Sequence, residues 1–275
     1  MGIYTPGAPS AEAAGASCQG RLREHNEDSL FHVDRMEPNA YGSHTFGIYL
    51  VADGIGGNQG GEIASESAVL SISKTLLDDL KPSGLPKAPS EALKQAIQEA
   101  HHKILLVGKE RRELQTMGTT VVVGLRLDYE LYLAHVGDSR AYLIRDNTIR
   151  QLTEDHSVVA ALLRQGAVTP KMAKVHPDKG KIYRSLGVTD ATVADISIRD
   201  DFRTKLTLCS GDGLLFCSDG LTDMVQDEEI ARCFETLSRP KSIARRLIQL
   251  ANSRGGFDDT SVVAVRLGKR THRVI

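Results

Sequence analysis

The sequence predicts an α+β protein in which antiparallel β-strands are covered by amphipathic helices. Residues 117–156 hold β-branched and aromatic runs separated by turn residues, which is the pattern of an antiparallel meander. Residues 62–80 and 90–111 repeat apolar side chains at helical spacing, over lengths sufficient to cover a sheet. Hydrophobic residues make up 41% of the 275 residues and charged residues 25%, a composition typical of a chain that buries a core.

The first segment of the chain lacks any core-like pattern. Residues 1–16 are rich in Ala, Gly, Pro and Ser without a period, which indicates a flexible tail. Removing this tail is therefore expected to leave activity and melting temperature nearly unchanged. Residues 17–268 are expected to form one domain, because no internal repeat or linker divides them, and the basic end 269–275 is expected to fray.

Several shorter elements follow from local patterns. Ser90 is expected to cap the second long helix. His101 and His102 are adjacent, so they face different directions and are expected at the surface. The irregular stretch 168–187 is either a functional flap or a plain surface excursion. The remaining elements are helices over residues 155–166, 228–234 and 242–252, and strands starting near Leu30 and over residues 48–52, 214–217 and 262–267.

Composition narrows the class of protein. The formal net charge is -1, so no broad attraction to nucleic acid or to a membrane is expected. No apolar run approaches the length of a membrane span, and the N-terminus lacks an apolar signal core. The four cysteines form no CxxC pair, and Cys209 and Cys217 lie in apolar company, so buried free thiols are expected. These observations predict a reduced, cytoplasmic protein, and we expect a monomer.

Four aspartates lie where a predicted buried strand starts or stops. They are Asp53 after residues 48–52, Asp138 after residues 131–136, Asp219 after residues 214–217, and Asp258 before residues 262–267. Each one alone is most simply a turn residue. Strands of one sheet or of two packed sheets can bring such ends together, and clustered carboxylates repel one another unless cations lie between them. The recurrence therefore predicts a cation site.

The candidate ligands indicate which cation and which reaction. All are oxygen atoms, with no Cys or His partner at metal-site spacing, which favours Mg²⁺ or Mn²⁺ over Zn²⁺. Two such ions about 3.5–4 Å apart can bridge a water and hold both ends of an in-line displacement. Phosphate-ester hydrolysis suits this chemistry best. Arg23 and Glu27 are either a solvated charge cluster or an Arg fork for phosphate beside a metal-binding carboxylate.

The ordered set of motifs resembles one known family. Any one motif is weak, but together they span about residues 18–267 and are similar to the series in the metal-dependent serine/threonine protein phosphatases of type 2C, the PPM family, in its compact bacterial form. The motifs are Arg23-x-x-Asn26-Glu27-Asp28, Asp53-Gly54-x-Gly56-Gly57, Met117-Gly118-Thr119-Thr120, Gly137-Asp138-Ser139-Arg140, Leu152-Thr153-x-Asp155-His156, Ser218-Asp219-Gly220-Leu221 and Gly255-Gly256-x-Asp258.

The resemblance implies a fold and an activity. The fold is an α-β-β-α sandwich: two packed antiparallel sheets flanked by helices on both outer faces. The activity is hydrolysis of phosphoserine and phosphothreonine in proteins by a water that two Mn²⁺ or Mg²⁺ ions bridge. A bacterial serine/threonine kinase is the expected opposing partner, which places the protein in signal transduction. Residues 168–187 are implied to form a mobile flap beside the cleft.

The resemblance also implies a role for each site residue. Asp53 bridges both ions and the Gly54 carbonyl helps to hold one of them, with Glu27 acting on that ion directly or through water. The other ion takes Asp219 and Asp258, and Asp138 holds a third, weaker ion together with Asp219. Arg23 binds the substrate phosphate, and Asp28 supports the metal ligands from behind.

Two positions depart from the family pattern. Asp259 stands where the family usually has Asn, so it is expected to add negative charge beside the site and to shift metal affinity. Ile55 stands where eukaryotic relatives carry a His that is proposed as general acid, so a metal-bound water is expected to protonate the leaving oxygen.

Two alternatives stay open at this point. The first is a pseudophosphatase that binds phosphoproteins without turnover, although every metal-ligand position holds a carboxylate. The second is a two-metal hydrolase of nucleotides or nucleic acid, which the near-neutral charge and the lack of a basic stripe disfavour.

Overall fold

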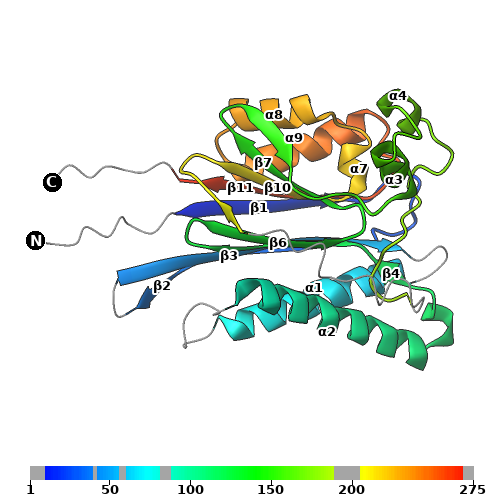
Figure 1. Ribbon diagram of the computed structural model, residues 1–275, viewed down its shortest axis with the longest axis horizontal. Coiled ribbons are helices and arrows are strands. Elements are labelled where there is room, and N and C mark those ends of the chain that lie inside the picture. The colour runs from blue at the N-terminus through cyan, green and yellow to red at the C-terminus, as the bar shows by residue number, and fades with distance from the viewer. Residues whose placement is uncertain (1–9, 40–41, 56–59, 81–87, 189–204, 269–275) are drawn as a thin grey trace, which may run out of the picture.

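The computed structural model describes residues 10–39, 42–55, 60–80, 88–188 and 205–268. In this part of the chain, two antiparallel sheets are stacked face to face, and helices cover the outer face of each sheet (Figure 1). The predicted α+β sandwich is therefore confirmed. No helix among the described residues is both long and apolar enough to cross a bilayer.

The lower sheet in Figure 1 has the strand order β2-β3-β5-β6-β9, and β4 pairs with the end of β3. Its strands are β2 (Asp28–Asn39), β3 (Gly42–Ile55), β4 (Gly118–Thr119), β5 (Val121–Leu127), β6 (Glu130–Val136) and β9 (Leu206–Thr207). In β3, Ile48 and Leu50 pack under the helices while Tyr49 and Val51 face the other sheet. This strand is buried on both faces, which explains its unbroken apolar run.

The upper sheet has the strand order β1-β11-β10-β7-β8. Its strands are β1 (Ala11–Cys18), β11 (Thr260–Leu267), β10 (Gly213–Cys217), β7 (Arg140–Arg145) and β8 (Thr148–Gln151). The predicted meander is thus divided, because β5 and β6 belong to the lower sheet while β7 and β8 belong to the upper one. Phe216 of β10 contacts Tyr49 across the interface, with ring centroids 5.6 Å apart.

The predicted flexible tail is wrong from Ala11 onward. Residues 11–18 form β1, which pairs with β11 along its whole length, from Ala11 opposite Leu267 to Cys18 opposite Thr260. Ala13 packs into the core between the sheets, and Ala16 packs into the core under the helices. The strand was missed because its inward side chains are too small to give a visible hydrophobic alternation. Residues 1–9 lie outside the described residues.

Helices form the two outer layers. The two long ones, α1 (Gly61–Asp79) and α2 (Pro89–Glu110), cover the lower sheet, while α8 (Asp227–Thr236) and α9 (Pro240–Ser253) cover the upper one (Figure 1). Ser90 is not a cap, because Pro89 already occupies the first turn and Ala88 takes the N-cap position. The short helices are η1 (Arg112–Leu114), α3 (Val158–Arg164), α4 (Pro170–Ala173) and α7 (Asp219–Thr222).

Two predictions about single side chains are wrong. Cys209 is exposed, whereas Cys217 is buried as expected. His101 is only partly exposed, since its Nδ1 accepts a hydrogen bond of 3.1 Å from the backbone N–H of Gly187. Its neighbour His102 is exposed, because adjacent positions of α2 face different directions.

A charged side chain lies in the core between the sheets. Arg126 of β5 has 1% of its surface exposed and donates hydrogen bonds to the hydroxyls of Tyr49 and Thr45, at 3.1 and 2.8 Å. Its guanidinium also pairs with Asp34 of β2 at 3.1 Å. These partners satisfy a cation that would otherwise be very costly to bury. They lie toward the ends of β2, β3 and β5 that are remote from the predicted aspartate cluster.

The sheet topology brings the predicted aspartates to one side of the sandwich. Asp53 stands opposite Asp28 in the β2–β3 register. Asp138 follows β6, Asp219 follows β10, and Asp258 precedes β11. In Figure 1 these strand ends lie beside α7 and β4, at the end of the molecule away from the two chain termini.

Candidate functional site

Asp53 lies at the centre of the carboxylate cluster. Burial raises the pKa of its carboxyl well above the ordinary value, and the negative charges of Asp28, Asp219, Asp138 and Asp258 raise that pKa further. Such mutual influence requires the carboxylates to be close together. The structure therefore brings together the four strand-end aspartates, and Asp28, which the resemblance placed behind them, lies beside Asp53.

The neighbouring carboxyls share this environment. Burial raises the pKa of Asp138 to about 8, with further contributions from Asp219 and Asp155. The pKa of Asp28 is raised to about 8, again mainly by burial. For Asp219, burial followed by the charges of Asp223 and Asp258 raises the pKa to about 6. The cations and hydrogen-bond donors of the protein thus compensate the negative charge of these buried carboxyls only in part.

Two oxygen atoms in the cluster have no hydrogen-bond partner. They are Oδ1 of Asp28 and Oδ1 of Asp219, and both are buried. Buried polar atoms in proteins are almost always paired, so an unpaired carboxylate oxygen here fits a cation. Within the described ranges, however, no three His, Cys, Asp or Glu side chains are already arranged as a metal site. The donor chemistry suits a divalent cation, while the ligand set itself stays a prediction.

Asp28 is held in place from the upper sheet. Its Oδ2 accepts a hydrogen bond of 2.7 Å from the hydroxyl of Ser218, the residue that precedes Asp219. The Ser218 oxygen in turn accepts the backbone N–H of Ser261 at 2.9 Å. This chain of bonds joins β2 to the start of α7 and to β11, and it fixes one carboxylate oxygen while leaving the other unpaired.

Two threonines brace the backbone of Asp53. The N–H of Asp53 donates to the hydroxyl of Thr120 at 3.0 Å, and its carbonyl accepts the Thr120 N–H at 2.8 Å and the Thr119 hydroxyl at 2.8 Å. The Thr120 hydroxyl also lies 2.7 Å from that of Ser139, beside Asp138. The motif that holds these threonines is part of the series that carries the family resemblance, but the sequence analysis gave the threonines no role of their own.

Gly54 must remain without a side chain. A Cβ at this position would lie 2.2 Å from the carbonyl oxygen of Gly61 and 2.6 Å from that of Glu27. The Gly54 N–H donates to the same Glu27 carbonyl at 3.1 Å. The close approach lets the start of α1 and the Glu27 loop meet beside Asp53. The Glu27 side chain is 18% exposed, and burial raises the pKa of its carboxyl.

Arg23 forms a forked ion pair with Asp258. Its Nε lies 2.7 Å from Oδ1 and its Nη2 lies 2.9 Å from Oδ2, while Nη1 lies 3.4 Å from a Glu27 oxygen. The hydrogen bond to Asp258 is the main cause that raises the pKa of the guanidinium. Both side chains are about 40% exposed, so the pair contributes little to stability. A guanidinium fork that fits two carboxylate oxygens also fits two phosphate oxygens.

Asp259 acts as a structural brace. The side chain is 3% exposed, and its two oxygens accept the backbone N–H groups of Gly20 and Glu27, each at 2.8 Å. An Asn side chain has one acceptor oxygen, so it would leave one of these N–H groups opposite its own NH₂. Asp259 therefore holds the loop that carries Arg23 and Glu27. Besides burial, its charge also contributes to the raised pKa values of Glu27 and Asp28, so it adds negative charge beside the site as expected, while its effect on metal affinity stays a prediction.

Asp155 is likewise paired within the protein. Arg140 of β7 holds its carboxylate in a fork, with Nη2 2.6 Å from Oδ2 and Nε 2.9 Å from Oδ1. The Arg140–Asp155 pair thus orders the start of the segment that leads to α3. Since Asp155 is occupied by Arg140, Asp138 is the carboxylate of these two that contributes to the cluster.

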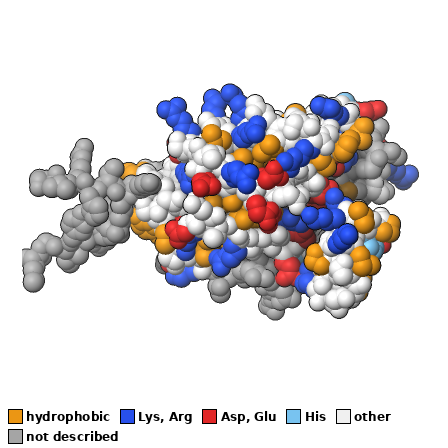
Figure 2. All heavy atoms as spheres, turned by 90° about the horizontal axis from the view of Figure 1, so that it is seen from above, with side chains coloured by type: hydrophobic (Ala, Val, Ile, Leu, Met, Phe, Trp, Pro, Cys, Tyr) orange, Lys and Arg blue, Asp and Glu red, His pale blue; other side chains and the backbone are white. Residues whose placement is uncertain are grey.

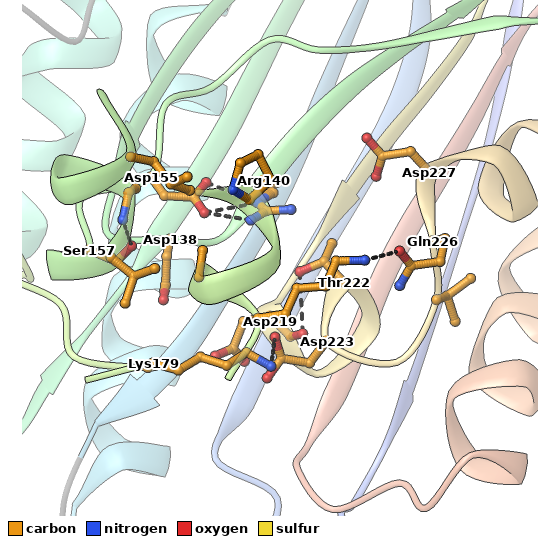
Figure 3. Close-up of a pocket in the computed structure, with 18 of the residues that line it drawn as sticks. Asp138, Arg140, Asp155, Ser157, Lys179, Asp219, Thr222, Asp223, Gln226 and Asp227 are labelled. Atoms are coloured by element: carbon orange, nitrogen blue, oxygen red, sulfur yellow. Dashed lines mark hydrogen bonds and ion pairs between the residues drawn. The ribbon is translucent and has the colours of Figure 1, made fainter. Parts of the chain in front are cut away.

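A pocket of about 480 Å³ adjoins the cluster (Figure 3). Asp138 and Asp219 are among its lining residues, and the others come from β7, from α3, α4, α7 and α8, and from the loops between them. The predicted flap, residues 168–187, borders this pocket through two contacts: Lys179 pairs with Asp223 at 3.0 Å, and Lys174 donates to Gln226 at 2.9 Å. Its position agrees with a flap, while its mobility stays a prediction.

Comparisons with known proteins agree on one family. A sequence profile described as protein phosphatase 2C matches residues 12–161. The serine/threonine phosphatase stp of Listeria monocytogenes is 38% identical over 255 residues, covering 90% of this chain and 92% of that protein. The serine/threonine protein phosphatase PstP of Mycobacterium tuberculosis is 34% identical over 250 residues, covering 91% of this chain and 44% of that longer protein.

Solved structures show the same fold. The serine/threonine phosphatase PstP/Ppp of Mycobacterium tuberculosis superimposes with a TM-score of 0.76 at 30% identity, covering 94% of this chain and 99% of that one. A catalytic domain of PstP in complex with two manganese ions gives a TM-score of 0.77 at 30% identity, with the same coverage. Staphylococcus aureus Stp1 gives 0.76 at 26% identity, covering 97% of this chain and 98% of that one.

Proposed function

Because this chain belongs to the protein phosphatase 2C family, we propose that it hydrolyses phosphoserine and phosphothreonine in proteins in a metal-dependent reaction. The observation that carries the proposal is the cluster of carboxylates at the sheet ends. Burial and mutual repulsion raise the pKa of its central member, Asp53, and two of its buried oxygens lack hydrogen-bond partners. The pseudophosphatase alternative is not supported, because the relatives are named as phosphatases and every carboxylate position of the motif series is filled.

The proposed roles follow the resemblance. Two bound Mn²⁺ or Mg²⁺ ions would activate a water and neutralise charge on the phosphate. Asp53 and the Gly54 carbonyl would hold one ion, with Glu27 acting directly or through water. The other ion would take Asp219 and Asp258. A PstP catalytic domain with two manganese ions supports the count of two for that relative.

Arg23 would orient the substrate phosphate. In the structure its fork holds Asp258, so this pair has to open before Asp258 can hold an ion and Arg23 can hold a phosphate. Asp28 would act from behind, because Ser218 fixes one of its oxygens and directs the residue toward the cluster. A cytoplasmic location, a monomeric state and an opposing serine/threonine kinase remain predictions from the sequence.

The proposed function is tested by removing the metal. Purified protein is expected to release phosphate from a phosphothreonine peptide in Mn²⁺, to lose that activity in excess chelator, and to regain it when Mn²⁺ is restored. The oxygen-only donor set is the physical reason. Activity that persists at full rate in chelator would contradict the proposal, and release of phosphate from nucleotides but not from the peptide would favour the nucleotide-hydrolase alternative.

A second prediction concerns Arg23. Arg23→Lys keeps the charge but loses the fork, so KM for the peptide is expected to rise roughly tenfold, and Arg23→Ala is expected to be worse in both KM and kcat. Melting temperature should change little, because the pair with Asp258 is exposed.

The alternative role for Arg23 is purely structural, as the partner of Asp258 and Glu27. In that case Arg23→Ala would keep normal kcat and KM per folded molecule and would lower only the melting temperature. Measuring the three quantities on both variants, with Arg21→Ala as an exposed neighbouring control, decides between the two roles.

A third ion is proposed at Asp138 and Asp219. If Asp138 serves only that ion, Asp138→Ala should bind two metals with unchanged affinity while losing most of its turnover. Calorimetric titration with Mn²⁺ gives the stoichiometry. Loss of one of the two tight sites in the titration would instead assign Asp138 to the core pair.

A further inference from the structure

The exposed face of α9 carries a dense group of cations. From Thr236 to Phe257 the chain holds five Lys and Arg residues and not one Asp or Glu. Arg254 is engaged with Glu229 of α8. The other four, here called the α9 basic face, are all exposed and line one shallow hollow of about 300 Å³: they are Arg239, Lys241, Arg245 and Arg246.

The α9 basic face is not neutralised by the surrounding protein. Within the part of the chain that the structure describes, none of its four cations has an acidic partner, whereas Arg23, Lys179 and Arg254 all do. Glu235, the acidic residue nearest in sequence, lines a different hollow. The space-filling view from the side of α8 and α9 shows several Lys and Arg side chains on this layer, with Asp and Glu side chains among them (Figure 2). A local positive surface therefore exists on a chain whose net charge is -1.

The chemistry of the α9 basic face fits phosphate. Three of its four cations are arginines, whose planar fork can meet two phosphate oxygens at once, whereas a compact ammonium cannot. Of the remaining lining residues, Ser242 and Gln249 supply further hydrogen-bond donors, and Leu237 is apolar. The hollow is shallow and at the surface, which suits a phosphate on an extended flexible segment rather than an enclosed small molecule.

We propose that the α9 basic face binds a second phosphate on the same protein substrate, away from the phosphate that is hydrolysed. This inference rests on the proposed function, because it names which phosphoproteins that site prefers. Substrates phosphorylated at two positions would be held at both, and the second contact would raise their effective concentration at the catalytic cluster.

The helix geometry sets the spacing of the two phosphates. The 14 residues of α9 span about 21 Å, and its C-terminal end leads through Arg254 to Asp258. An extended peptide covers roughly 3.3 Å per residue, so about seven residues are needed to run the length of this helix. The preference is therefore expected for phosphates about seven to ten residues apart, and not for phosphates two residues apart.

The test uses phosphothreonine peptides that carry a second, non-hydrolysable phosphonate. The quantity compared is kcat/KM for a peptide with the phosphonate eight residues away, divided by kcat/KM for the same peptide without it. For the unmodified protein this ratio is expected to be roughly five to ten, and to fall as ionic strength rises. With the phosphonate two residues away, the ratio should be about one.

Charge reversal locates the effect. Arg245→Glu with Arg246→Glu is expected to reduce the ratio to about one or below. The matched control is Lys103→Glu with Lys109→Glu, which makes the same charge change at exposed positions of α2 on the opposite layer and should leave the ratio unchanged. Because a ratio is measured, a general loss of activity in either variant cancels.

Several results would overturn the inference. A ratio of one for the unmodified protein, or an equal fall in both double variants, would do so. The inference would also be overturned if the α9 double variant kept the ratio of the unmodified protein but lost binding to anionic vesicles or to single-stranded DNA. That result would assign the α9 basic face to those partners. Failure of the unmodified protein to hydrolyse any phosphopeptide in Mn²⁺ would instead refute the proposed function.

Discussion

Asp53→Asn is expected to lower kcat on a phosphothreonine peptide by at least about a thousandfold while the protein remains folded. The amide keeps the shape of the carboxyl, and the bonds from Thr119 and Thr120 hold the backbone at this position whatever the side chain carries. The charge that would hold the ions is nevertheless lost. The measurement is kcat at saturating Mn²⁺, with circular dichroism to confirm the fold.

The same variant has an opposite effect on the metal-free protein. Burial and neighbouring carboxylates raise the pKa of Asp53, so the folded protein retains a proton that the unfolded chain has lost. The stability of the metal-free protein should therefore fall as pH rises from about 4 to about 8, through the raised pKa values of Asp219, Asp28 and Asp138. Asp53→Asn removes one ionisable carboxyl from the cluster and is therefore expected to raise the melting temperature in chelator at pH 8.

A variant of a pocket residue outside the carboxylate cluster serves as the matched control for Asp53→Asn. Asp227 lines the pocket beside the cluster but is not among the carboxylates that raise the pKa of Asp53. Asp227→Asn should therefore keep kcat within an order of magnitude of the original value. It should also leave the melting temperature in chelator at pH 8 unchanged. Near-normal turnover in well-folded Asp53→Asn protein would remove Asp53 from the metal centre.

Deletion of residues 1–16 is expected to destabilise the protein severely. It removes most of β1, the edge strand that pairs with β11 along eight residues and packs beneath α9. The ladder hydrogen bonds are lost and the apolar side of α9 is uncovered, so a fall in melting temperature on the order of 10 °C or more is expected. Thermal unfolding followed by circular dichroism measures the change, and insoluble expression would agree with it.

Point variants provide the control for this deletion. Ala13 packs between the sheets, so Ala13→Asp should place a charge in an apolar environment and reproduce part of the loss. Glu12 is exposed, and Glu12→Gln should melt at the original temperature. If the truncated protein has the same melting temperature as the full chain, β1 does not contribute to the stability of the upper sheet.

Much of this structure could be predicted because the decisive patterns are local. The run ending at Asp53 is buried on both faces and therefore uniformly apolar, and the α8 and α9 segments show clear helical periodicity. Strand-end aspartates can be recognised one by one, and their meeting follows once the strands form antiparallel sheets. The class of site was accordingly within reach of sequence reasoning.

The remaining features depend on partners far away in the chain. Arg126 occupies an inward position of β5 that the alternation would assign to an apolar residue. Its bonds to Asp34, Thr45, Tyr49 and the Asp128 carbonyl make its burial tolerable. The partner of Arg23 is 235 residues distant. The bracing role of Asp259 depends on two backbone N–H groups near the other end of the sequence, and no local pattern reports such contacts.

The brace formed by Asp259 also has a consequence for the order of events during synthesis. It joins the loop around Gly20 and Glu27 to a residue 239 positions later, and the β1–β11 ladder joins the same two regions. Closing a loop of this length is slow, since contacts distant in sequence form late. A ribosome that has produced everything up to Phe257 therefore holds a chain with neither Asp258 nor this brace, and we expect the nascent protein to acquire its catalytic cluster only after the last strand has emerged.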